Sequence, residues 1–127
     1  MSPEQFKHYL VGNPKFDSEH YMMFERINIF RALENPSVEE GEQALQDVLI
    51  SFTEHVAAEE SYMEATDFKF LEYHKTLHSS LSKQLGRYIK THAMFGKLIK
   101  NELYDSSLAL AHHIDEADRQ FYDLHKI

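Results

Sequence analysis

Apolar residues recur every three or four positions along most of this chain, which is the spacing of one face of an α-helix. Glycine and proline rarely interrupt the pattern, because the 127 residues include four glycines and three prolines. A few long helices are therefore favoured over many short elements. We predict an all-α fold, an antiparallel up-down-up-down four-helix bundle with an N-terminal arm, which forms one domain over residues 1–127.

The first helix is expected to follow an irregular arm formed by residues 1–16. Asp17 has the side chain of an N-cap, so we expect the helix to begin near Ser18. It should end before Pro36, because the residue that precedes a proline disfavours the helical conformation.

The starts of the other three helices are also marked by polar residues. Ser37 and Glu40 have the spacing of a capping box, which opens the second helix. Asp67 is expected to start the third helix. The sequence loses its periodicity over residues 93–103, so the fourth helix is expected to begin near residues 105–106.

Seven side chains that can bind metals fall on or beside the apolar stripes of these helices. They are His20, His55, Glu59, His74, His78, His113 and Asp118. Two pairs among them, His55 with Glu59 and His74 with His78, are four residues apart and therefore share a helix face. Any one of these histidines could be a hydrogen-bonded core residue, but a buried group of seven needs a partner, because desolvation makes unpaired charges and polar atoms costly. We predict that a metal is that partner.

The remaining four histidines have a different expected role. His8 lies in the arm, His112 and His125 fall off the centre of the fourth stripe, and His92 lies about 21 Å along the helix from His78. We expect all four to be structural or surface residues.

The spacing of His113 and Asp118 is unusual for two ligands on one helix. They are five residues apart, and a regular α-helix would turn them about 140° away from each other. Either both side chains lean inward from the edges of the stripe, or the helix is locally widened to i→i+5 hydrogen bonding.

Composition narrows the possible metals, partners and location. The chain has no cysteine, so any metal must be held by nitrogen and oxygen atoms. Its formal charge of −8 argues against nucleic acid or an anionic membrane as the main partner. We find no signal-peptide pattern and no apolar run long enough to span a membrane, so we expect a cytoplasmic protein. The sequence does not identify a protein partner.

The order and spacing of the candidate ligands resemble the successive motifs of the hemerythrin family along nearly the whole chain. The matching segments are Phe16-Asp17-Ser18-Glu19-His20, His55-x3-Glu59-Glu60-x2-Met63, His74-x3-His78 and His113-Ile114-x3-Asp118. Val11 and Gly12, which precede the first motif, are similar to the short bacterial members in particular.

The resemblance implies a non-haem di-iron centre (Fe2+/Fe3+) that binds dioxygen reversibly. By analogy, His74, His78 and His113 would hold one iron, His20 and His55 would hold the other, and Glu59 and Asp118 would bridge them together with an oxo or hydroxo group. The second iron would then have one ligand fewer, and dioxygen would bind at its open position. Imidazole and carboxylate accept several metals, so the choice of iron depends on the family likeness.

Three functions are compatible with this sequence. The first is an oxygen carrier, store or sensor, which is not an enzyme. The second is a di-iron redox protein that handles peroxide, nitric oxide or iron. The third is a helical interaction module without a metal. The many histidines and the lack of an evident proton donor near them favour the first.

Two departures from the family pattern concern tryptophan, which this chain lacks. The family usually has one tryptophan in the N-terminal arm, where this chain has Gln5 or Phe6, and another four residues before the last histidine ligand, where it has Ala109. Alanine in place of an indole predicts a space beside the metal pocket, and entry of water there would favour oxidation of the irons.

Overall fold

The computed structural model describes residues 3–97 and 99–125, and within these ranges the regular secondary structure is entirely helical. The elements are α1 (Pro3–Phe6), the 3-10 helix η1 (Lys7–Tyr9), α2 (Pro14–Ala32), α3 (Val38–Ala65), α4 (Leu71–Phe95), α5 (Lys100–His113), the π-helix η2 (Ile114–Asp118) and α6 (Arg119–Leu124). The predicted all-α class is confirmed.

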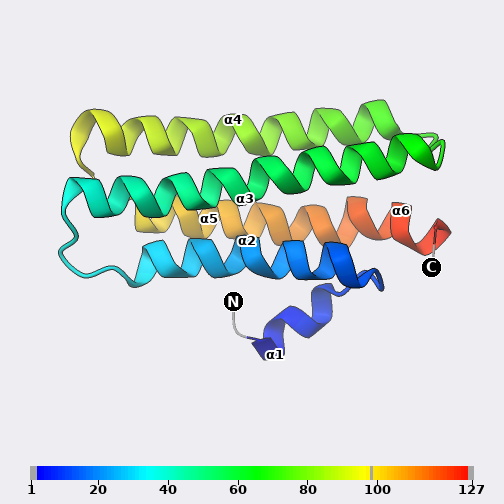
Figure 1. Ribbon diagram of the computed structural model, residues 1–127, viewed down its shortest axis with the longest axis horizontal. Coiled ribbons are helices and arrows are strands. Elements are labelled where there is room, and N and C mark those ends of the chain that lie inside the picture. The colour runs from blue at the N-terminus through cyan, green and yellow to red at the C-terminus, as the bar shows by residue number, and fades with distance from the viewer. Residues whose placement is uncertain (1–2, 98, 126–127) are drawn as a thin grey trace.

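The long helices lie side by side along the longest axis of the molecule (Figure 1). Helix α2 contacts α3, α3 contacts α4, α4 contacts α5, and α5 contacts α2. The elements α5, η2 and α6 follow one another without an intervening loop. Each long helix therefore has two neighbours, and the side chains between them are enclosed from several directions.

Helix α2 begins four residues earlier than predicted, and Asp17 is not its N-cap. Asn13 caps the helix through its side-chain oxygen, which accepts hydrogen bonds from two backbone N–H groups of the first turn, and Pro14 occupies the first helical position. The carboxylate of Asp17 instead accepts hydrogen bonds from the backbone N–H groups of Val11 at 2.7 Å and Gly12 at 3.2 Å. Asp17 thus fixes the arm against the helix.

Helix α3 begins with the predicted capping box. The Ser37 hydroxyl accepts a hydrogen bond from the backbone N–H of Glu40 at 3.1 Å, and the Glu40 carboxylate accepts one from the backbone N–H of Ser37 at 3.2 Å. Two N–H groups that no helical carbonyl can reach are satisfied in this way.

The predicted starts of the last two long helices were wrong. Asp67 has a φ of 53° and belongs to the turn that ends α3, so α4 begins four residues later at Leu71. Helix α4 ends at Phe95, where Gly96 adopts a φ of 62°, and α5 already begins at Lys100. The connection is therefore shorter than expected, and one of its residues, 98, lies outside the described ranges.

The N-terminal arm is more regular than predicted and packs against the long helices. It contains α1 and η1, and the ring of Phe6 lies 5.3 Å from that of Tyr21 and 5.9 Å from that of Phe24. The Arg119 guanidinium donates hydrogen bonds to the backbone carbonyls of His8 and Leu10. The arm is thereby attached to α2 and to α6.

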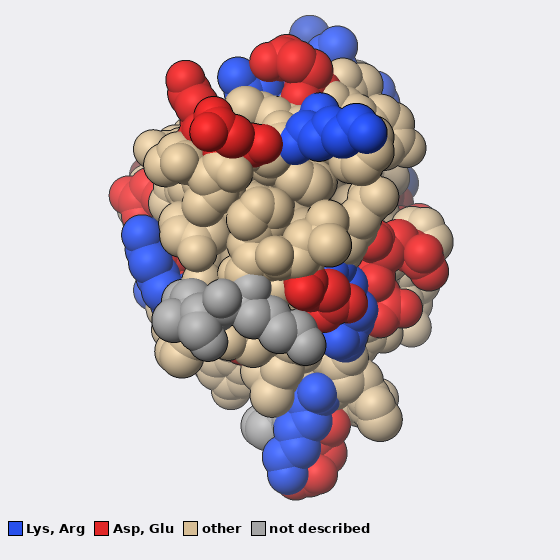
Figure 2. All heavy atoms as spheres, turned by 90° about the vertical axis from the view of Figure 1, so that its right-hand side faces the viewer, with Lys and Arg blue, Asp and Glu red and all other residues tan. Residues whose placement is uncertain are grey.

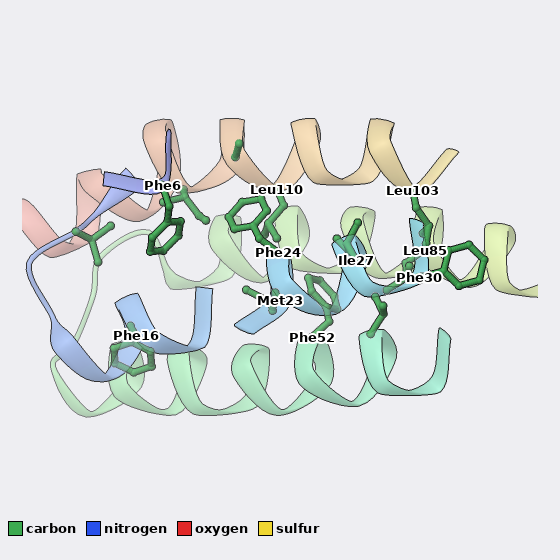
Figure 3. Packing of buried hydrophobic residues seen from close by; sticks show 14 of the residues in the cluster. Phe6, Phe16, Met23, Phe24, Ile27, Phe30, Phe52, Leu85, Leu103 and Leu110 are labelled. Atoms are coloured by element: carbon green, nitrogen blue, oxygen red, sulfur yellow. The ribbon is translucent and has the colours of Figure 1, made fainter. Parts of the chain in front are cut away.

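Buried apolar side chains from every long helix form the core. Figure 3 shows Phe52 extending from α3 and Leu110 from α5 into the interior, where Met23 and Phe24 of α2 also lie. At the end of the molecule shown in Figure 2, acidic and basic side chains surround an uncharged middle, so neither sign of charge dominates that face. None of the described helices has both the length and the apolar character needed to cross a membrane.

Candidate metal centre

All seven predicted ligands are buried and lie together between the long helices. Their donor atoms form two groups, in each of which the atoms are within 4.8 Å of one another. The first group is Glu59, His74, His78, His113 and Asp118, and the second is His20, His55, Glu59 and Asp118. The two carboxylates belong to both groups.

In the first group, three histidines face one oxygen of each carboxylate. The Nε2 atom of His74 lies 2.9 Å from Oδ1 of Asp118 and 3.1 Å from Oε1 of Glu59. The Nε2 atom of His78 lies 3.0 Å from the same Glu59 oxygen, and that of His113 lies 3.0 Å from the same Asp118 oxygen.

In the second group, two histidines face the opposite oxygens of the same carboxylates. The Nε2 atom of His20 lies 3.3 Å from Oδ2 of Asp118 and 3.7 Å from Oε2 of Glu59. The Nε2 atom of His55 lies 3.4 Å from Oε2 of Glu59. Each carboxylate therefore presents one oxygen to each group, as a ligand shared by two cations would.

Several of these donor atoms are buried without a hydrogen-bond partner. They are both ring nitrogens of His20, Nε2 of His78, Nε2 of His113 and both carboxylate oxygens of Asp118. Unpaired buried polar atoms are costly, and nearly all such atoms in proteins have a partner. A metal ion bound by nitrogen and oxygen would satisfy them, so these residues fit a metal centre, although the donor set is compatible with several metals.

The π-helix η2 explains how His113 and Asp118 both reach the site. The backbone N–H of Arg119 bonds to the carbonyl of Ile114, which is the i→i+5 pattern of a widened helix. Of the two alternatives drawn from the sequence, the widened helix is confirmed. The extra residue in this turn brings the two side chains to the same face.

Two glutamates outside the predicted set hold ligand histidines in place. Oε1 of Glu19 lies 2.7 Å from Nδ1 of His55, and Oε2 of Glu60 lies 2.7 Å from Nδ1 of His78. A carboxylate only accepts here, so Nδ1 carries the proton and Nε2 keeps its lone pair for a metal. Each contact joins two helices, and sequence spacing within one helix could not have shown it.

Tyr122 is a further residue that the sequence reasoning missed. Its buried phenol donates a hydrogen bond to Oε2 of Glu59 at 2.8 Å. It follows Asp118 by four residues, so its place on the same helix face was a signal that could have identified it. The expectation that no proton donor lies near the ligands was therefore wrong. Burial, and next the charge of Glu59, raise the pKa of this phenol far above its usual value.

The histidines and carboxylates of the centre stabilise each other's charged forms. Burial lowers the histidine pKa values, but the adjacent carboxylates of Asp118 and Glu59 outweigh it and raise the pKa of His20 and of His74 to about 9. The pKa of His55 is also raised, because Glu19 and Glu59 outweigh its burial. Burial would raise the carboxyl pKa values, yet the histidines hold the pKa of Glu59 and of Asp118 well below the usual range. Both carboxylates are therefore ionised at neutral pH.

A surface hollow of about 670 Å³ lies beside His113, between α4 and the run of α5 and η2. Ala109 and Leu77 are among its lining residues. Ala109 therefore borders a surface hollow next to His113, whose Nε2 atom is itself buried.

The other four histidines lie outside both donor groups. His8 and His112 are exposed, and Nδ1 of His125 contacts the backbone carbonyl of Phe121 at 3.0 Å. His92 is buried, and its Nδ1 donates to the carbonyl of Lys97 at 2.9 Å. Among the described residues, none of the four belongs to a cluster of ligand-type side chains.

Comparisons of the chain with protein-family models, curated proteins and solved structures found no match.

Proposed function

We propose that the chain is a hemerythrin-like protein that binds two non-haem iron ions and, through them, dioxygen in a reversible way, as a carrier, store or sensor. The observation that supports this most strongly is the division of the site. Glu59 presents one oxygen to His74 and His78 and the other to His20 and His55. Asp118 presents one oxygen to His74 and His113 and the other to His20.

We also propose the antiparallel up-down-up-down topology for this bundle. It is supported by the order of contacts, in which each long helix touches the next and α5 touches α2. The chain colours in Figure 1 run in opposite directions along successive long helices. Short connections between neighbours are typical of such bundles.

In this proposal the two ions have unequal sets of protein ligands. One ion is held by His74, His78 and His113, the other by His20 and His55, and both share Glu59 and Asp118. The second position has one protein ligand fewer, which leaves room for an external molecule. When bound, two iron ions supply electrons for the reversible binding of dioxygen.

The surrounding residues keep the ligands oriented and the site dry. Glu19 and Glu60 fix the rings of His55 and His78, so that Nε2 of each points at the shared carboxylates. Apolar side chains around the centre limit the entry of water. They are Phe24, Phe52, Leu110 and Ile114, and all four are buried.

Redox chemistry on peroxide, nitric oxide or iron is the second candidate, and the contact between Tyr122 and Glu59 favours it. A phenol beside a bridging carboxylate could deliver a proton to a reduced oxygen species. The raised pKa of Tyr122 opposes this, because the proton stays on the phenol near neutral pH. We therefore place reversible binding first.

Anaerobic reduction followed by exposure to air tests the proposal. The protein should form a coloured species in air that bleaches again when oxygen is removed, over repeated cycles. The His113→Gln variant should lose this response, whereas His112→Gln, which changes the exposed neighbouring histidine, should keep it. Multiple turnovers with peroxide, without a reversible coloured form, would support the redox protein instead. A wild-type protein that contains no iron would contradict both candidates.

A further inference from the structure

A small, mostly buried but not fully enclosed cavity of about 30 Å³ lies between the four long helices. Each of these helices contributes an apolar side chain to its wall. These side chains include Met23 of α2, Phe52 of α3, Leu81 of α4 and Leu110 of α5.

The cavity forms the layer next to the candidate metal centre. Met23 and Leu81 each follow a candidate ligand by three residues, and Phe52 and Leu110 each precede one by three residues. The ligands in question are His20, His78, His55 and His113, in the same order. Because neighbouring helices run in opposite directions in the proposed topology, all four steps point the same way along the bundle. Three residues correspond to about 4.5 Å of helix, so the cavity and the centre are adjacent layers.

The wall of the cavity offers little to a water molecule. Its two polar side chains are Gln84 and Ser106, and the Ser106 hydroxyl donates a hydrogen bond to Oε1 of Gln84 at 3.4 Å. A buried water usually makes about three hydrogen bonds, whereas apolar cavities stay dry and accept apolar guests such as xenon. A volume of about 30 Å³ exceeds the roughly 10–15 Å³ that one water needs. The cavity therefore suits a single small apolar molecule.

We propose that this cavity is a docking site for a small apolar gas, namely dioxygen, which binds there transiently before it reaches the candidate metal centre. The inference deepens the proposed function and rests on it for the identity of the gas. The cavity itself is independent of any bound metal, because its wall contains none of the seven candidate ligands.

Leu81 is the gate of this docking site. It is partly exposed, and its side chain lines both the internal cavity and the surface hollow beside His113. The leucine therefore forms a wall between solvent-accessible space and the cavity. In this proposal, a change in the Leu81 rotamer opens the passage between the two spaces.

Xenon binding to the purified protein, with its metal content measured, tests the docking site. Xenon NMR should show one saturable site in the wild type, and a crystal under xenon pressure should place the atom between Phe52 and Leu110. The Leu81→Phe variant should lose the site, because the larger ring occupies the cavity. Leu77→Phe is the matched control on the same helix, since Leu77 lines the surface hollow but not the cavity, and it should keep the site.

A variant that enlarges the cavity keeps the proposal testable if Leu81→Phe does not fold. Val48→Ala removes two methyl groups from the cavity wall and should retain the xenon site. Absence of a saturable site in the wild type, ordered water in the cavity, or equal loss in Leu77→Phe would overturn the proposal. In the iron-loaded protein, Leu81→Phe should also slow dioxygen association several-fold. Xenon binding in a protein without iron would retain the gas site but refute the dioxygen function, so the two failures are distinguishable.

Discussion

In its metal-free form, the protein should become less stable as the pH is raised from about 6.5 to above 9. The pKa of His20 and of His74 rises from 6.5 to about 9 on folding, because the adjacent carboxylates of Asp118 and Glu59 outweigh the effect of burial. A raised pKa means that the folded protein holds these protons more tightly than the unfolded chain. The stabilisation is therefore complete below pH 6.5 and is lost as the pH rises through 9.

The size of the effect follows from the same values. A pKa difference of one corresponds to about 1.4 kcal/mol, so the rise from 6.5 to about 9 corresponds to about 3 kcal/mol for one imidazole. His20 and His74 share the same two carboxylates, so their contributions are not additive, and we expect about 3 kcal/mol for the pair. At the acidic end, the pKa values of Glu59 and Asp118 are lowered on folding. Their ionised carboxylates therefore stabilise the folded protein at pH values above the usual carboxyl pKa range, and this stabilisation is lost as the pH falls below that range.

Urea unfolding at a series of pH values measures this dependence directly. The metal-loaded protein should behave in the opposite way between pH 6 and 8, because metal binding requires neutral imidazoles and therefore strengthens as the pH rises. In the metal-free protein, His74→Gln should reduce the slope of the free energy of unfolding against pH, and His112→Gln should leave this slope unchanged. The electrostatic reasoning would be refuted if the free energy of unfolding of the metal-free protein stayed constant or rose between pH 6.5 and 9.

Two further predictions concern residues around the centre and in the helix contacts. Tyr122→Phe removes the hydrogen bond to Glu59 and should weaken metal affinity about 10- to 100-fold in competition titrations with a chelator, and an unchanged affinity would show that the phenol does not support the ligand. Gly41→Ala places a methyl group 2.9 Å from the buried ring of His92 and should lower the free energy of unfolding by about 1–3 kcal/mol. Gly86→Ala, in open space on α4, should raise it by about 0.5–1 kcal/mol, and a loss of stability there would contradict the packing argument.

The sequence predicted the helical class and the seven clustered side chains because both follow from local periodicity. A stripe at helical spacing turns a one-dimensional pattern into a face, and residues on four such faces meet in the interior. The capping box at Ser37 was equally local and was predicted correctly. The widened turn at Asp118 was one of two alternatives. The spacing of His113 and Asp118 alone shows that a regular helix would not place both side chains on one face, but it does not show how the backbone adjusts.

Two of the incorrect helix starts come from residues with more than one possible hydrogen-bond partner. Asp17 has the chemistry of an N-cap, but Asn13 with Pro14 supplies an earlier start, and the Asp17 carboxylate binds the arm instead. Asp67 also has cap chemistry but adopts a left-handed turn conformation. The contacts of Glu19 and Glu60 depend on which helices are neighbours, and a single sequence does not give that information.

A crystal structure with anomalous diffraction measured at the iron absorption edge tests the proposed di-iron centre directly. We expect two peaks in each chain, one beside His74, His78 and His113 and the other beside His20 and His55, with Glu59 and Asp118 between them. A single peak, no peak, or histidine rings turned away from the shared carboxylates would contradict it.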